Sequence, residues 1–223
     1  MRDTTPDTGL DTGLDTGLDR RALVAAILDR RGNAAVVAGL GSPAWDCHAA
    51  GDSSLNFYFW GAMGGAAMLG LGVALAQPTR RVLVVTGDAE MLMGVGSLAT
   101  IAAQAPSNLA VLVLDNEAFG ETGRQAGLTR KHADIAAIAR GAGIGADSEA
   151  DSEAGIGAAF TVGGDVEEGS PGMDIDALAG TLFEAEGPVL CVAKVALSAE
   201  PGSYPPRDGV LLRDRFRAAL AGA

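Results

Sequence analysis

Residues 81–120 have the sequence RVLVVTGDAEMLMGVGSLATIAAQAPSNLAVLVLDNEAFG, which indicates the fold class. Residues 81–86 and 109–114 are short, uninterrupted runs of apolar and β-branched side chains, a pattern typical of strands buried on both faces. Residues 94–104 are predicted to form a helix between them. A strand, a helix and a second strand in this order are typical of parallel strands in an α/β sheet.

The same alternation continues on both sides of this stretch. A helix is predicted after Asp19, its N-cap, because the apolar residues that follow share one helical face. Further strands are expected at 34–38, 158–162 and 189–195, and further helices at 134–140 and 175–186. We therefore predict an α/β fold, a mainly parallel sheet with helices on both faces, with ligands at the carboxyl ends of the strands.

The chain is expected to hold a single domain, residues 19–223, behind a low-complexity tail. Residues 1–18 include three copies of Asp-Thr-Gly-Leu, a turn-like repeat too short for a solenoid, and are predicted to be disordered. Residues 143–173 are rich in acidic and small side chains, so we expect a flexible acidic insert around the strand at 158–162. A length of 223 residues leaves little for a second substantial domain.

Charge and cysteine content exclude several classes of protein. The net charge of −12 argues against a nucleic-acid partner, because phosphate backbones select basic surfaces. Cys47 and Cys191 are far apart without metal-ligand spacing, and the first residues lack an apolar signal core, so a cytoplasmic protein is expected. The uncharged stretch 53–79 is long enough to span a bilayer. Its many glycines and the strand that follows favour a buried interface helix instead.

Polar side chains follow two of the predicted strands at the point where each strand ends. Asp88 comes directly after residues 81–86, and Asn116 follows residues 109–114. A carboxylate and an amide oxygen at neighbouring strand ends suit a hard cation such as Mg²⁺, and the helix after Gly87 offers backbone N–H groups to a phosphate. Alternatively, Asp88 only caps a helix and Asn116 only forms a turn. Their occurrence together, 28 positions apart, favours the cation site.

This stretch resembles the thiamine-diphosphate motif, in which Gly-Asp-Gly is followed at a distance by Asn. The resemblance extends upstream to GAMGGAAMLGLGVALA at 61–76 and downstream to GETGRQ at 120–125. It covers roughly residues 36–130 and continues more loosely to PPRDG near residue 205. The chain is similar in particular to beta subunits of sulfopyruvate decarboxylase and to the C-terminal part of phosphonopyruvate decarboxylase. The resemblance implies the thiamine-diphosphate-binding fold called the PP module.

The resemblance also implies a role for individual residues. A Mg²⁺ ion would be held by the side chains of Asp88 and Asn116 and by the backbone carbonyl of Ala118. The N–H groups of Ala89 and Glu90 would approach the diphosphate. Ala89 replaces the third glycine of the motif, a small change that still allows close backbone approach. Glu90 stands where Ser or Ala is commoner, so its carboxylate is tolerable if it points away from the diphosphate or is neutralised by a partner chain.

A second part of the site is implied around Gly61. Its carbonyl would accept a hydrogen bond from the cofactor's pyrimidine amino group, and Met63 would be the apolar wedge that keeps the cofactor bent. The alternative for Met63 is a core methionine. Thr122 and Gln125 fit the family pattern and are expected to line the cofactor side of the pocket. The full set of predicted cofactor-binding residues is Gly41, Ser42, Gly61, Ala62, Met63, Gly87, Asp88, Ala89, Glu90, Asn116, Ala118, Gly120, Glu121 and Thr122.

The implied activity is decarboxylation of a small 2-oxo acid, sulfopyruvate- or phosphonopyruvate-like, with chemistry that thiamine diphosphate largely supplies. In the resembled family, the glutamate that activates the pyrimidine ring belongs to a separate pyrimidine-binding module. We find no second module of that kind in this sequence, so a partner chain is expected to carry the glutamate. The expected assembly is a heterotetramer or larger, with the interface formed largely by the glycine-rich helix after Gly61.

Other functions remain open from the sequence. An acetolactate-synthase-like carboligase subunit uses the same cofactor module, and a non-catalytic relative would keep the fold alone. A dinucleotide enzyme is disfavoured because the turn at 39–44 lacks the third glycine of Gly-x-Gly-x-x-Gly. Cys47 and His48, expected in a loop ahead of the long apolar helix, are interpreted as incidental.

A group of basic residues follows the predicted cofactor loop. Arg124, Arg130 and Lys131 either bind an anionic substrate tail, such as a sulfonate or phosphonate, or form a solvated charge run. His132 is either a proton donor or a surface residue.

Overall fold

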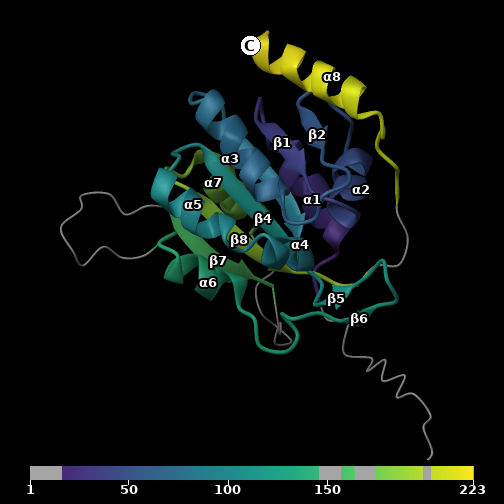
Figure 1. The fold of residues 1–223 in the computed structure, drawn as a ribbon, viewed down its shortest axis with the longest axis vertical. Coiled ribbons are helices and arrows are strands. Elements are labelled where there is room, and N and C mark those ends of the chain that lie inside the picture. The colour runs from purple at the N-terminus through teal and green to yellow at the C-terminus, as the bar shows by residue number, and fades with distance from the viewer. Residues whose placement is uncertain (1–16, 146–156, 164–173, 198–201, 223) are drawn as a thin grey trace, which may run out of the picture.

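The computed structural model describes residues 17–145, 157–163, 174–197 and 202–222. Its main feature is a six-stranded sheet in the order β2-β1-β3-β4-β8-β7, in which each neighbouring pair is parallel (Figure 1). The strands are β1 (Ala35–Ala38), β2 (Asn56–Tyr58), β3 (Val82–Gly87), β4 (Leu109–Asp115), β7 (Ala158–Val162) and β8 (Val189–Lys194). The predicted parallel α/β sheet is confirmed.

Helices cover both faces of the sheet. The core on one face includes side chains of α1 (Arg20–Asp29), α2 (Ser42–Ala49) and α7 (Ile175–Glu184). The core on the other face includes side chains of α3 (Ala66–Ala76), α4 (Asp88–Met93), α5 (Ser97–Gln104) and α6 (Ile135–Gly141). The helix α8 (Gly209–Ala221) contacts β2 at the edge of the sheet and contributes to both cores. Successive residues of β3 alternate between the two cores, as a pleated strand requires.

The strand order places a crevice at one end of the sheet. From β1 the chain runs to β2 at the sheet edge, whereas the next strand, β3, pairs with the other side of β1. The connections that leave β1 and β3 therefore diverge at the carboxyl ends of these strands. In open parallel sheets, ligands bind at such a switch point.

Residues 53–79 do not form the single long helix that their composition suggests. They form β2, a glycine-rich loop at 61–65 and the shorter helix α3. Gly61 and Gly64 have φ angles of 93° and 86°, in the left-handed region that interrupts a right-handed helix. In the described part of the chain, no helix has the length and apolar character needed to cross a membrane.

Three helices differ from the sequence-based expectation. Cys47 and His48 lie in α2 rather than in a loop, because Pro43 in the first turn of α2 presets a helical φ angle. The helix α8 was not predicted, although the Asp208 side chain caps it by accepting backbone N–H groups. The helix predicted at 94–104 begins only at Ser97, because the separate helix α4 already starts at Asp88 and ends before Gly94.

The remaining predicted strands and helices are confirmed within a few residues of their expected bounds. The Asp19 side chain caps α1 by accepting a hydrogen bond from the N–H group of Ala22. Leu18, within the predicted tail, forms a parallel bridge to Val195. Residues 1–16 of that tail lie outside the described residues, as do residues 146–156 and 164–173 of the acidic insert.

Candidate functional site

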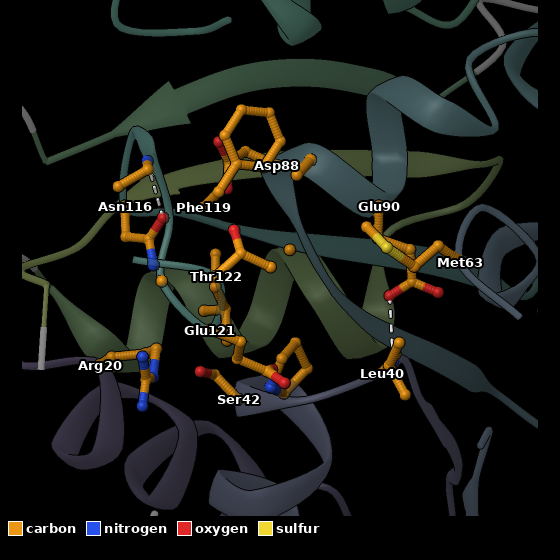
Figure 2. A pocket seen from close by; sticks show the side chains of 16 residues that line it. Arg20, Leu40, Ser42, Met63, Asp88, Glu90, Asn116, Phe119, Glu121 and Thr122 are labelled. Carbon is orange, nitrogen blue, oxygen red and sulfur yellow. Dashed lines mark hydrogen bonds between the residues drawn. The ribbon is translucent and has the colours of Figure 1, made fainter. Parts of the chain in front are cut away.

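A cavity of about 270 Å³ opens at the carboxyl ends of the central strands. Figure 2 shows the side chains that point into it from the ends of β3 and β4 and from the loops beside them. From the predicted cofactor-binding set, the cavity is lined by Ser42, Met63, Gly87, Asp88, Ala89, Glu90, Asn116, Ala118, Gly120, Glu121 and Thr122. Gly41, Gly61 and Ala62 are not among the lining residues. Arg20, Leu40, Pro43, Leu114 and Phe119 line the cavity without having been predicted.

Asp88 is the first residue of α4 and is only 3% exposed. The Thr129 hydroxyl lies 3.1 Å from Oδ2 of Asp88 and 2.8 Å from Oδ1 of Asp115. Because a hydroxyl carries one proton, it donates to only one of these carboxylates at a time. Burial, and secondly the charge of Asp115, raise the pKa of Asp88 to about 6. The carboxylate of Asp88 therefore sits in a site that favours an added positive charge.

The charge of Asp115, the last residue of β4, is balanced within the chain. The Lys194 ammonium group, at the end of the neighbouring strand β8, donates to Oδ2 of Asp115 at 2.8 Å and to Oε1 of Glu117 at 2.5 Å. Among the described residues, Asp88 has no comparable ion pair. The two adjacent carboxylates thus differ, one paired with a lysine and the other facing the cavity.

The chain turns sharply after β4. Oδ1 of Asn116 accepts a hydrogen bond from the N–H group of Ala118 at 3.0 Å, and Glu117 adopts a left-handed φ angle of 59°. This turn leads into a short antiparallel hairpin of β5 (Ala118–Phe119) and β6 (Gln125–Ala126). Asn116 is therefore a turn residue, as the alternative interpretation holds, and it also lines the cavity.

The carboxylate of Glu90 points to the turn that follows β1. Its Oε2 atom accepts the N–H group of Leu40 at 3.1 Å and the hydroxyl of Thr86 at 2.9 Å. Burial is the main influence on the pKa of Glu90 and raises it above its usual range, although the Thr86 hydroxyl opposes the rise. Glu90 thus has hydrogen-bond partners within this chain.

Met63 lies in the glycine-rich loop and is 42% exposed, so the interpretation as a core methionine is wrong. Its side chain lines the cavity on the side of Glu90 (Figure 2). The loop packs against the end of α4, where a Cβ atom added to Gly94 would lie 2.1 Å from the carbonyl oxygen of Gly64. Only glycine at position 94 allows this close approach.

Two of the predicted positions outside the lining still adjoin it. A Cβ atom on Gly41 would lie 1.7 Å from Oε1 of Glu121, and Gly41 has a left-handed φ angle of 76°. A glycine is therefore required at position 41, where the turn after β1 meets the hairpin.

The Gln125 side chain does not line the cavity. It exchanges hydrogen bonds with Thr122, which does line the cavity.

The basic residues considered for substrate binding do not line the cavity, and neither does His132. The arginine that does line it is Arg20, which is buried and paired with Asp46 of α2. No sequence signal identified this pair, because it depends on a helix that was not predicted. Cys47 is fully buried, and Nδ1 of His48 lies 2.6 Å from the hydroxyl of Ser203. Both side chains are therefore packed within the fold, and neither lines the cavity.

The family model for the thiamine pyrophosphate enzyme, C-terminal TPP binding domain, matches residues 44–167. The chain belongs to this family. The matched segment contains most of the cavity lining, from Met63 to Thr122. The family and the fold expected from the resemblance are both confirmed.

Two curated relatives are similar to parts of this TPP-binding chain. Sulfopyruvate decarboxylase subunit beta of Methanothermobacter thermautotrophicus is 46% identical over 90 residues, which make up 40% of this chain and 48% of that protein. Phosphonopyruvate decarboxylase of Streptomyces viridochromogenes is 47% identical over 111 residues, which make up 50% of this chain and 28% of that protein. The similarity thus spans less than half the length of either relative.

A solved structure supports the fold. The thiamine diphosphate-dependent 4-hydroxybenzoylformate decarboxylase of Rhodococcus jostii RHA1 matches with a TM-score of 0.61 at 18% identity, covering 83% of this chain and 34% of that one. At this level of identity the likeness shows the fold alone.

Proposed function

We propose that this chain is the cofactor-binding subunit of a thiamine-diphosphate- and Mg²⁺-dependent decarboxylase that acts on a small 2-oxo acid. The observation that carries the proposal is the buried carboxylate of Asp88, which faces the same cavity as Asn116 and Ala118. The similarity to sulfopyruvate and phosphonopyruvate decarboxylases favours a substrate with an anionic tail.

The residues present fit a magnesium ion. Asp88, Asn116 and the carbonyl of Ala118 supply the oxygen ligands that Mg²⁺ prefers. A cation beside Asp88 would offset the burial and the repulsion by Asp115 that raise the pKa of Asp88 to about 6. The N–H groups of Ala89 and Glu90, in the first turn of α4, would then face the diphosphate.

When bound, thiamine diphosphate supplies the electron sink for loss of CO₂ from a 2-oxo acid. The chain's own residues bind and orient the cofactor. Met63 offers an apolar edge beside the cavity, and Leu114 and Phe119 add apolar surface that limits access of water. The glutamate that activates the pyrimidine ring is assigned to the partner chain, in keeping with the relatives named as beta subunits.

A partner chain would meet the exposed side of α3. Met68, Gly72 and Leu75 are exposed on this helix, which carries no charged residue. Met63, in the loop that leads into α3, and Met93, at the end of α4 on which this loop packs, are exposed as well. An uncharged, apolar surface next to a cofactor site suits an interface at which two chains complete the site together.

The test is calorimetric titration with thiamine diphosphate, with and without Mg²⁺, on the chain alone and with a candidate pyrimidine-binding subunit. We expect Mg²⁺-dependent binding that tightens with the partner and is lost in Asp88→Ala. The control is Asp214→Ala, which removes an exposed carboxylate on α8 and should leave binding unchanged. No binding under either condition would contradict the proposal and favour a non-catalytic relative. Product analysis then separates decarboxylation from carboligation.

A further inference from the structure

The carboxylate of Glu90 joins three segments around the cavity. Glu90 belongs to α4, its hydrogen bond to Leu40 reaches the turn after β1, and its hydrogen bond to Thr86 reaches the end of β3. The side chain is only 4% exposed, so these hydrogen bonds are shielded from competition with water. A buried carboxylate held in this way restrains the groups that donate to it.

The turn after β1 is shaped to receive this carboxylate. A Cβ atom on Gly39 would lie 2.0 Å from Oε2 and 2.8 Å from the carboxyl carbon of Glu90. Gly39 does not adopt a left-handed φ angle, so its backbone conformation is open to any residue. The space taken by the carboxylate is therefore the reason that a side chain does not fit at Gly39.

The glycine-rich loop that carries Met63 lies on the other side of Glu90. Within the described residues, Oε1 of Glu90 is buried without a hydrogen-bond partner, so the carboxylate makes no hydrogen bond to this loop. The same loop rests on the far end of α4 through the close approach of Gly64 and Gly94. The loop thus packs on the end of α4 at Gly94, and Figure 2 shows the Met63 side chain beside Glu90.

We propose that Glu90 is a positioning residue that fixes the turn after β1 and the end of β3 to α4, the helix that begins with Asp88. Asp88 would thereby stand at a set distance from the turn after β1, whose residues Leu40 and Ser42 line the cavity. The inference rests on the proposed function only for what the cavity binds. The departure of Glu90 from the residues usual in the motif gains a local explanation, because its carboxylate accepts the backbone N–H group of Leu40 and the hydroxyl of Thr86.

The first test measures amide hydrogen exchange in the full, cofactor-free chain. In Glu90→Ala we expect exchange at the Leu40 amide to quicken about tenfold or more, the change expected when a hydrogen bond to a charged group is lost. Glu90→Gln keeps an acceptor oxygen of the same reach and should restore slow exchange. Asn108→Ala removes three hydrogen bonds at the opposite end of the sheet and serves as the control for general destabilisation.

Two outcomes would overturn the inference: unchanged exchange at the Leu40 amide in Glu90→Ala, or an equal increase there in Asn108→Ala. Because this measurement needs no cofactor, it decides the role of Glu90 even if the chain fails to bind thiamine diphosphate. In the binding assay, Glu90→Ala should weaken Mg²⁺–thiamine diphosphate about tenfold, with recovery in Glu90→Gln. Tighter binding in Glu90→Ala would show that the carboxylate repels the diphosphate, contrary to the inference.

A double-mutant cycle with Gly39 provides the second test. Gly39→Ala should displace the carboxylate and reproduce the faster exchange of the Leu40 amide. In a chain that already carries Glu90→Ala, the added methyl group enters vacated space, so Gly39→Ala should have little further effect. Fully additive effects would show that Gly39 acts independently of Glu90 and would overturn the shared-space explanation.

Discussion

The single residue Asp88 links the proposed metal site to the stability of the cofactor-free chain. Its pKa is raised from 3.8 to about 6 by burial and by Asp115. The folded chain therefore holds this proton more tightly than the unfolded chain, and the group destabilises the fold most above pH 6. The unfavourable contribution of Asp88 to the free energy of unfolding should therefore diminish as the pH falls from 7 toward 4. Asp88→Asn should add on the order of 2–3 kcal/mol to the free energy of unfolding at pH 8.

Urea unfolding at several pH values checks this prediction on the chain without metal or cofactor. The difference between Asp88→Asn and the native chain should shrink as the pH falls from about 6 and approach zero below the ordinary pKa of 3.8, where the native side chain is protonated in both states. A difference that is independent of pH would contradict the raised pKa. The stabilised variant should also lose Mg²⁺-dependent cofactor binding, because an amide cannot replace the carboxylate charge.

The position of Asp88 and Asn116 beside one cavity could be predicted from the sequence, because each residue follows a buried strand and the two strands are neighbours in the sheet. It did not predict the direction of Glu90, because the hydrogen bond to Leu40 joins residues 50 positions apart. Arg20 was missed for the same reason, since its burial depends on Asp46 of α2. The position of a residue could be predicted where the end of a strand determines it. It could not be predicted where a contact between distant parts of the chain determines it.

At the scale of elements, α3 offers a matched pair of glycines. A Cβ atom on Gly70 would lie 2.1 Å from Cγ2 of Val84 in β3, whereas one on Gly72 would meet nothing within 4 Å. Gly72→Ala should stabilise the chain by about 0.5–1 kcal/mol, because alanine loses less backbone entropy in a helix. Gly70→Ala should destabilise it by about 1–3 kcal/mol through overpacking. Denaturant unfolding of both variants checks this, and effects of the same sign would refute the packing of α3 on β3.

The limits of prediction from sequence are clearest in the elements from β2 to α3. The apolar composition of residues 53–79 indicated burial, which β2 and one side of α3 confirm. Hydropathy did not reveal that Gly61 and Gly64 adopt left-handed φ angles and separate a strand from a helix. Buried strands such as β4 were predicted closely, because their uninterrupted β-branched runs have few alternative structures.

At the scale of the whole molecule, the proposed interface makes a prediction about assembly. Leu75 on α3 and Leu211 on α8 are 50% and 52% exposed, so a charge at either position should be tolerated by the isolated fold. If α3 meets the partner, Leu75→Glu buries an unpaired carboxylate there and should weaken association on the order of a hundredfold or more. Leu211→Glu, on the helix at the β2 edge, should associate normally.

Sedimentation of each variant with a candidate pyrimidine-binding subunit measures this difference, and thermal unfolding of the separate chains confirms that both variants fold. Loss of assembly in Leu75→Glu alone would place the partner on the exposed side of α3, the helix into which the Met63 loop leads. Cofactor binding by the isolated Leu75→Glu chain should stay at the level of the isolated native chain, because Leu75 does not line the cavity. Normal assembly of Leu75→Glu would instead exclude α3 as the interface, while leaving the metal site and the role of Glu90 to their own tests.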